Sequence, residues 1–307
     1  MKKIFTCLVV AAMSLSNVQA KLILHESFDR AVGNLHIGLN TDMGTNTEDW
    51  WSYSGDKNFI QVAEGSLAWE GFAAAKGNKA ELNIFSSAAD DLRQFAQVNS
   101  GKVFLAAIIN VDELKSSATS DYCLSLGSAT SSGMYARLYT KSVKEEGEWK
   151  GFKLGVGKNN ESNTYIRMTE EVFEAKKDML VVLEYEFIDG EKNDEARLYI
   201  NPTKQTSAPS IVCVQDTVSG SGAAQGANAK NDADFIASVD LRQGSNTPKI
   251  FIDEIKVATS WADLWESGTG FEEVQSDKVQ STKVIKNGVL VIKRDDKEYN
   301  AQGQLMK

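Results

Sequence analysis

The chain has 307 residues, a formal net charge of -9 and 42% hydrophobic residues. That length is enough for one large all-β domain with an appendage. A surface this acidic disfavours nucleic acid and anionic lipid as partners, because both gain affinity from lysines and arginines that replace counterions.

The first twenty residues have the layout of a cleavable secretory signal. Lys2 and Lys3 precede an apolar run, and small and polar residues follow up to Ala20. This pattern predicts cleavage after Ala20 and a location outside the cell or on its outer surface. Loss of the two lysines takes the net charge of the mature chain to -11. No later run is long and apolar enough to predict a transmembrane segment.

Residues 22–29 begin as an apolar strand and end in acids, and the stretch 33–55 is rich in Gly, Asn, Thr and Asp. We expect this second stretch to form a long loop over one end of a sandwich. Short strands are predicted at 59–62 and 65–69. Residues 86–97 have Leu and Phe at helical spacing after a serine cap, which predicts one short helix.

From residue 102 onward, segments of alternating polarity recur between Gly, Asn, Asp and Ser clusters. Many strands with such punctuation predict an all-β fold, a two-sheet antiparallel jelly-roll sandwich. The predicted strands are 103–111, 122–126, 135–140, 152–156, 164–168, 180–187 and 196–200. The turn residues at 189–194 predict a hairpin between the last two.

Two further runs with period two lie between Asp232 and Trp265. Apolar residues alternate with polar ones over 235–241 and again over 250–257, and a Gly-Ser-Asn cluster separates the runs. The pattern predicts two neighbouring antiparallel strands joined by a hairpin. A short segment from Trp261 to Trp265 closes the domain. The stretch 217–231, rich in Gly and Ala, is interpreted as a surface loop.

The chain after Trp265 changes character. Residues 266–282 are polar and are predicted to form a linker, whereas 283–307 is a β segment with an Asn-Gly turn signal at 287–288. Two cysteines follow the signal, Cys123 and Cys213. They form either one disulfide or two separate buried thiols.

The run at 180–202, followed by DADFIASVDLRQG and FIDEIKVATSWADLW, resembles a concanavalin A-like (laminin-G-like) jelly-roll domain found in secreted proteins of Bacteroidetes. The opening ESFDR and GSLAWEGF fit the same pattern, so the resemblance covers residues 22–265. The tail resembles a degenerate C-terminal sorting domain of type IX secretion, which implies the secretion machinery as a partner. The resulting organisation is a signal peptide at 1–20, a jelly-roll domain at 21–265, a linker at 266–282 and a sorting-like β segment at 283–307.

No catalytic residues emerge from the sequence. The Glu-x-Asp-x-x-Glu spacing of concanavalin A-like glucanases is absent, and neither His25 nor His36 has a partner at metal-ligand spacing. Glu184 and Glu186 share one face of a predicted strand. They form either a pair of catalytic carboxylates or part of a solvated sheet face.

Two binding sites are predicted instead. The resemblance to concanavalin A-like jelly rolls implies a structural calcium ion, which such domains often hold between acids of the first and last strands. Glu26, Asp29 and Asp253 match those positions. The alternative is that these acids are ordinary polar residues at the edge of a sheet. The aromatic group at Trp50, Trp51 and Tyr53 has the chemistry of a glycan-binding platform. Tryptophans that attach a loop to the core are the other interpretation.

These observations predict a secreted, non-catalytic β-sandwich module that binds a polysaccharide or other glycan. A polysaccharide-degrading enzyme of concanavalin A-like fold (a hydrolase or lyase) is the first alternative, and a structural or adhesive surface protein is the second.

Overall fold

The computed structural model describes residues 22–39, 49–84, 88–129, 133–159, 166–214 and 231–265, with the backbone of 282–286, 289–294 and 297–299. The chain divides into two compact units, Met1–Trp265 and Glu266–Lys307. The predicted signal peptide, the loop at 217–230 and the predicted linker up to residue 281 lie outside the described residues.

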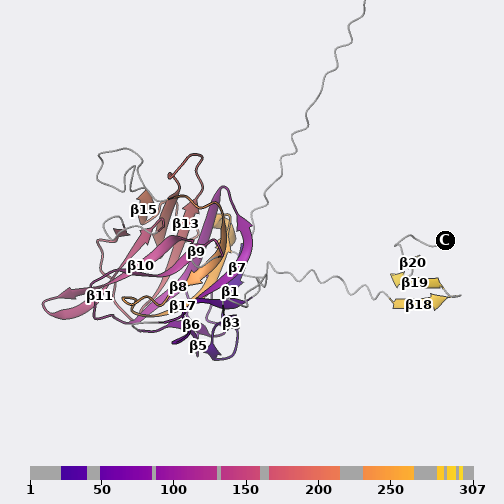
Figure 1. Ribbon diagram of the computed structural model, residues 1–307, viewed down its shortest axis with the longest axis horizontal. Coiled ribbons are helices and arrows are strands. Elements are labelled where there is room, and N and C mark those ends of the chain that lie inside the picture. The colour runs from indigo at the N-terminus through magenta and orange to yellow at the C-terminus, as the bar shows by residue number, and fades with distance from the viewer. Residues whose placement is uncertain are drawn as a thin grey trace, which may run out of the picture. The chain divides into compact units, whose positions relative to one another are not determined.

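The first unit is a two-sheet sandwich, with β8, β13 and β17 in one sheet and β9 and β10 in the other (Figure 1). This confirms the predicted jelly-roll class. Eight strands of the nine-stranded sheet form a path, and β1 pairs with β17 beside it. In path order they are β15 (Ile211–Val214), β14 (Glu195–Ile200), β13 (Asp178–Glu186), β8 (Lys102–Glu113), β17 (Lys249–Ala258), β6 (Lys79–Leu82), β5 (Gln61–Ala63) and β2 (Gly33–Asn34), with β1 at Leu22–Glu26.

The eight-stranded sheet faces the first across the interior. In order its strands are β12 (Arg167–Met168), β11 (Glu148–Gly157), β10 (Met134–Glu145), β9 (Asp121–Gly127), β16 (Ile236–Leu241), β7 (Asp90–Val98), β4 (Trp50–Ser54) and β3 (Gly38–Leu39). The strands in both sheets pair antiparallel, except that β3 runs parallel to β4. The predicted hairpin of β13 and β14 is confirmed.

The core lies between the sheets because one face of each strand is apolar. Leu105 and Ile109 of β8, Ile252 of β17, and Leu126 of β9 are fully buried in one continuous cluster. A second cluster covers the opposite face of the nine-stranded sheet, where Trp265 packs beside the short helix α1 (Trp261–Leu264). That sheet is therefore apolar on both faces over part of its area.

Four local predictions are wrong. Residues 65–69, predicted as a strand, do not form one, and within them Trp69 makes only an isolated bridge to Ala73. The strands β16 and β17 do not form a hairpin, because β16 pairs with β7 and β9 in one sheet while β17 pairs with β8, β6 and β1 in the other. Residues 90–98 form strand β7 rather than a helix. The expected loop at 33–55 contains β2, β3 and β4, which brings Trp50 into a sheet.

The helix prediction failed because Leu92 and Phe95 do not share a face. In β7, Phe95 belongs to the core between the sheets, whereas Leu92 packs with Tyr53 on the opposite side. Pairing with β4 on one edge and β16 on the other satisfies the backbone of β7 as a strand. Tertiary pairing overrides a three-residue spacing in so short an apolar run.

The second unit contains a three-stranded antiparallel sheet of β18 (Thr282–Lys286), β19 (Val289–Arg294) and β20 (Lys297–Tyr299). The register sets Lys286 opposite Val289, as a two-residue connection requires. The Asn-Gly turn itself lies outside the described residues. In the part of the chain that the structure describes, no helix has the length and apolar character to cross a membrane.

Candidate functional site: the polar face of the eight-stranded sheet

Trp50 is an interior residue rather than part of an exposed platform. It is fully buried, and its indole Nε1 donates a hydrogen bond to Glu26 at 2.8 Å. Phe28 stacks on it with ring centroids 6.0 Å apart. Trp50 therefore joins β4 to β1 across the core, which is the second of the two interpretations of this aromatic group.

Trp51 and Tyr53 point to the opposite side of β4, yet both are buried. A Cβ atom on Gly38 would lie only 2.3 Å from Cζ3 of Trp51, so the backbone of β3 lies directly against this indole ring. The three aromatic residues therefore do not form a platform whose ring faces are exposed to solvent.

The predicted calcium ligands do not gather around one point. The carboxylate of Glu26 accepts hydrogen bonds from the Phe28 amide, Arg30 and Arg93 in addition to Trp50. These donors already occupy the lone pairs that a calcium ion needs.

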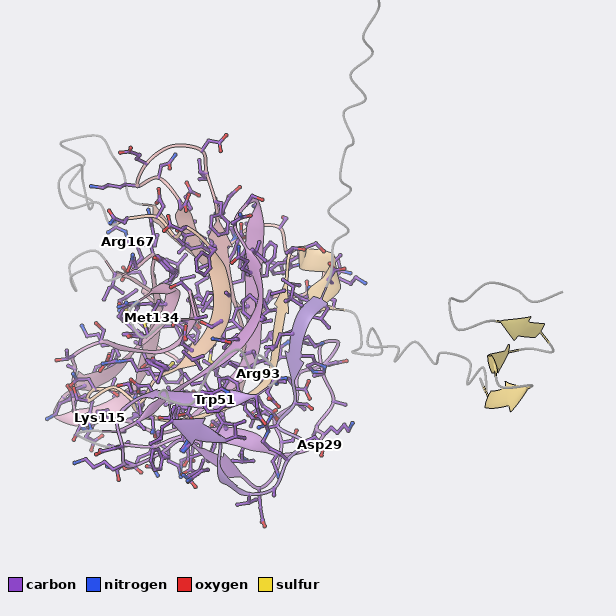
Figure 2. All side chains as sticks on the ribbon, turned by 45° about the vertical axis from the view of Figure 1, so that its right-hand side comes forward. Asp29, Trp51, Arg93, Lys115, Met134 and Arg167 are labelled. Atoms are coloured by element: carbon purple, nitrogen blue, oxygen red, sulfur yellow. The ribbon has the colours of Figure 1, made fainter. Side chains whose placement is uncertain are left out.

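The other two acids lie elsewhere. Asp29 has 67% of its side chain exposed and lies at the periphery in Figure 2. The carboxylate of Asp253 accepts hydrogen bonds from the backbone amides of Leu67 and Glu254, each at 2.8 Å. Among the described residues there is no group of three His, Cys, Asp or Glu side chains arranged to hold a metal ion. The residues present do not fit the calcium site that the resemblance implies.

Glu184 and Glu186 share a face of β13, as the sequence predicts, and form part of an ion-pair network. Glu184 is buried and accepts hydrogen bonds from Lys102 at 2.8 Å, Arg197 at 2.7 Å and Tyr199 at 2.6 Å. Glu186 accepts a second bond from Arg197 at 2.5 Å. These bonds fix both carboxylates in place, and their arrangement has the character of a structural network.

Cys123 and Cys213 are both buried and are not joined by a disulfide. They lie on different sheets, Cys123 on β9 and Cys213 on β15. Burial raises the pKa of the Cys123 thiol to about 12, so it packs as a small apolar group.

A group of polar and aromatic side chains lies on the outer side of the eight-stranded sheet, away from the main core. We name this surface the polar face. The strand register builds it, since Leu92, Asp240 and Ser125 lie side by side on β7, β16 and β9. The residues of this face that carry a hydroxyl, carboxyl or guanidinium group are Tyr53, Asp90, Tyr122, Ser125, Arg137, Tyr139, Asp240 and Arg242.

Tyr122 is the centre of the polar face. The guanidinium carbons of Arg137 and Arg242 each lie 4.4 Å from the centroid of its ring, and Tyr139 packs at 5.7 Å. Guanidinium groups at such distances are attracted to the ring electrostatically. Arg242 also pairs with Asp121, and 28% of its side chain is exposed. Tyr122 and Arg242 are therefore the members through which the polar face reaches solvent.

Burial changes the charge of this face. Asp240 is completely buried, and desolvation raises the pKa of its carboxyl group well above the usual range. Its oxygen accepts a hydrogen bond from Ser238 at 3.2 Å. Desolvation also raises the pKa of Asp90 to about 6, although the Gln243 amide and Arg242 oppose this shift. Burial therefore disfavours the charged forms of Asp240 and Asp90, next to the two arginines of this face.

Two hydroxyl groups of the polar face have no hydrogen-bond partner within the described part of the chain. They are the phenol of Tyr53 and the hydroxyl of Ser125, and both oxygens are buried. Burial raises the pKa of Tyr53 well above its ordinary value, so the phenol stays protonated and can donate. Unsatisfied buried hydroxyls are rare in folded proteins, and an ordered water is the usual partner of such a group.

Of the residues predicted from the sequence, only Tyr53 belongs to the chemical centre of this face. Tyr122, Arg137 and Tyr139 were missed. The alternation around Leu138 gives a signal for Arg137 and Tyr139, whereas alternation over 122–126 would place Tyr122 with the core residues Leu124 and Leu126, and only a register shift against β10 puts it on the polar face. Aromatic and cationic residues at every second position of a strand share one side. The sequence could not show that β9, β10 and β16 are neighbours, which is what brings these side chains together.

Comparison with known proteins gives a fold-level result. No protein-family model matches the chain, and no curated protein matches it either. Among solved structures, a variant of alginate lyase Aly36B in complex with alginate trisaccharide aligns at a TM-score of 0.45 and 8% identity, covering 77% of this chain and 97% of that one. The T. cruzi calreticulin globular domain aligns at 0.45 and 11%, covering 80% and 91%. A Trypanosoma rangeli sialidase complex aligns at 0.36 and 13%, covering 70% and 31%. Because these TM-scores and identities are low, the similarities give no information about the ligand or the activity of this chain.

Proposed function

We propose that this protein is a secreted or cell-surface, non-catalytic module that binds carbohydrate on the polar face. One observation carries the proposal. The partly exposed Tyr122 lies within 4.4 Å of the guanidinium groups of Arg137 and Arg242, on a sheet that also contains hydroxyls without a partner in the described residues. A sugar ring has an apolar face bordered by hydroxyl groups, so it suits an aromatic ring surrounded by donors and acceptors.

The aromatic group Trp50, Trp51 and Tyr53, which the sequence analysis considered as a glycan platform, has a different role in this proposal. Trp51 and Tyr53 lie on the same side of β4 as the polar face, of which Tyr53 is a member, whereas Trp50 supports β4 from within the core. Tyr122 is the partly exposed aromatic residue of this face, and the partly exposed guanidinium group of Arg242 beside it offers hydrogen-bond donors to a ligand. Tyr53 contributes its phenol rather than its ring face.

Export is part of the same proposal. Residues 1–20 would direct the chain across the inner membrane, and residues 283–307 would pass it to a secretion machinery. The support is the charge and hydropathy pattern of the first segment and the short three-stranded sheet of the last. An exported module with an acidic surface is suited to extracellular glycans rather than to nucleic acid.

The test is retention of the full mature chain in affinity gels that contain different polysaccharides. We expect at least one polysaccharide to retard the protein, and we expect Tyr122→Ala to abolish the retardation. Trp149→Ala is the matched control, because this aromatic residue is also flanked by a cation, Lys144 at 5.5 Å, but lies at the far end of the β10–β11 hairpin.

The outcomes separate the alternatives. Equal retardation of wild type and Tyr122→Ala would refute the polar face as the binding site. Release of reducing ends or unsaturated sugars during the same incubation would show that the chain is an enzyme. No retardation by any polysaccharide would favour a structural or adhesive role.

A further inference from the structure

A cavity of about 510 Å³ lies at one margin of the sandwich, far in the strand order from β4 and β7. The edge strand of each sheet ends there, β12 in the eight-stranded sheet and β15 in the nine-stranded sheet. The two strands pack near one another without pairing. The space between the sheet edges is large enough for a small organic molecule, for which such sites usually measure about 300 to 1,000 Å³.

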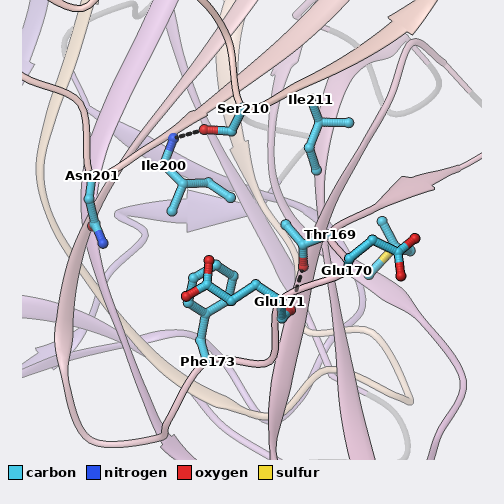
Figure 3. A pocket seen from close by; sticks show the side chains of 9 residues that line it. Thr169, Glu170, Glu171, Phe173, Ile200, Asn201, Ser210 and Ile211 are labelled. Carbon is cyan, nitrogen blue, oxygen red and sulfur yellow. Dashed lines mark hydrogen bonds between the residues drawn. The ribbon is translucent and has the colours of Figure 1, made fainter.

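The floor of the cavity is apolar and well supported. Phe173, Ile200 and Ile211 line it and pack against the main core (Figure 3). Phe173 also contacts the fully buried ring of Phe152, with centroids 5.9 Å apart.

Two glycines of β11 hold the neighbouring segment close to this strand. A Cβ atom on Gly155 would lie 2.3 Å from the sulfur of Met168, and one on Gly151 would lie 2.3 Å from the carbonyl oxygen of Phe173. Side chains at these positions would push the segment outward. The glycines therefore fix Met168 and Phe173 as walls of the cavity.

Most polar groups that line the cavity are used by the protein itself. Thr169 donates to the carbonyl oxygen of Glu171 at 2.9 Å, and Ser210 accepts from the Ile200 amide at 3.0 Å (Figure 3). The carbonyl oxygen of the Asn201 side chain accepts from the Leu180 amide at 3.1 Å. These bonds shape the walls and leave few groups to hold a ligand.

The carboxylates of Glu170 and Glu171 are different. Both line the cavity and are exposed, and neither forms an ion pair with any Lys, Arg or His within the described part of the chain. Nearby Glu174, by contrast, pairs with Lys177 at 2.5 Å. In Figure 3 the side chains of Glu170 and Glu171 extend in opposite directions, that of Glu171 to the side of Phe173 and that of Glu170 away from it. A negative charge beside an apolar floor complements a molecule that joins an apolar body to a cationic group.

We propose that this cavity is a second binding site, for a small organic cation that carries an apolar ring or chain. The apolar part would lie on Phe173, Ile200 and Ile211, and its ammonium group would face Glu171, with Glu170 adding negative charge at the margin of the cavity. The site is separate from the polar face and does not depend on carbohydrate binding.

The test is an NMR titration of the full mature chain with 2-phenylethylamine, followed through the backbone amides of Thr169, Asn201 and Ser210. We expect saturable shifts of these amides. The isosteric acid 3-phenylpropionate should cause none, and n-butylamine, which lacks the ring, should bind more weakly. The comparison separates the charge from the apolar body.

Variants locate the charge. Replacing both carboxylates in E170Q/E171Q should weaken 2-phenylethylamine binding about five-fold or more, since each exposed ion pair contributes only a small free energy. E174Q is the matched control on the same segment and should leave the affinity unchanged. The proposal is overturned if 3-phenylpropionate binds equally well, if E170Q/E171Q binds as wild type does, or if the three amides do not shift. Each of these results would leave the carbohydrate proposal untouched.

Discussion

Glu26 on β1 and Arg93 on β7 form an ion pair through the interior of the sandwich, joining the nine-stranded sheet to the eight-stranded sheet. Glu26 has 5% of its side chain exposed and Arg93 has 17%. The same carboxylate accepts hydrogen bonds from Trp50 and Arg30. A residue that the sequence offered as a metal ligand is thus the centre of a network that connects the sheets.

Glu26→Gln should therefore destabilise the fold strongly. The substitution leaves Arg93 buried without its anion, and breaking a buried pair in this way costs about 3 to 5 kcal/mol. Urea unfolding measures the loss. Glu148→Gln is the control, because Glu148 pairs with Lys150 in an exposed position. Equal stability of the two variants would contradict the role given to Glu26.

The contact of Gly38 with Trp51 predicts a coupled pair. Gly38→Ala should cost about 1 to 3 kcal/mol, because its new methyl group overlaps the indole ring. The double variant Gly38→Ala/Trp51→Leu should recover part of that cost, since the smaller side chain leaves room. A double-mutant cycle by chemical unfolding gives the coupling energy. Strict additivity of the two single changes would show that the contact has no energetic role.

The unpartnered phenol of Tyr53 gives a prediction that separates binding from folding. Tyr53→Phe removes a buried hydroxyl with no partner in the described structure, so stability should stay the same or rise by about 1 kcal/mol. Retardation in the polysaccharide gel should decrease. Loss of stability by more than about 1 kcal/mol would mean that the hydroxyl serves the fold.

Asp253 predicts a pH dependence of stability. Desolvation raises its pKa from 3.8 to about 7 against the opposing hydrogen bonds from the Leu67 and Glu254 amides. The folded state therefore binds more protons than the unfolded state between about pH 4 and pH 7, and the contribution of this group to stability is lost as pH rises through that range.

The measurement is thermal unfolding of Asp253→Asn and wild type from pH 4 to pH 8. The stability of the variant relative to wild type should improve as the pH increases, because Asn has no charge to bury. Asp29→Asn, at an exposed position, should show no such trend. A difference between Asp253→Asn and wild type that is constant with pH would contradict the raised pKa.

Deleting residues 283–307 should separate export from folding. We expect the melting temperature of the remaining chain to stay nearly unchanged, because the core of the sandwich is built from residues before 266. Delivery to the cell surface should stop. Differential scanning calorimetry and surface labelling measure the two effects. A large decrease in melting temperature would show that the segment belongs to the sandwich.

The sequence by itself determined the fold class and many of the strands. Period-two runs such as 180–187 and 250–257 have one apolar side, and such a side must be buried, so strands with these patterns stack into a sandwich whatever the connections. Residues 86–97 were assigned wrongly because a short apolar spacing fits a helix and a strand equally well.

Beyond the β13–β14 hairpin and the β18–β19 pair, which the sequence predicted, only the tertiary structure decided which strands are neighbours. It separated β16 from β17, moved Trp50 and Glu26 into one buried network, and set Tyr122 beside Arg137 and Arg242. The physical reason is that alternation records which side of a strand is apolar but carries no information about the partner strand. The polar face and the cavity at the sandwich margin are products of that pairing.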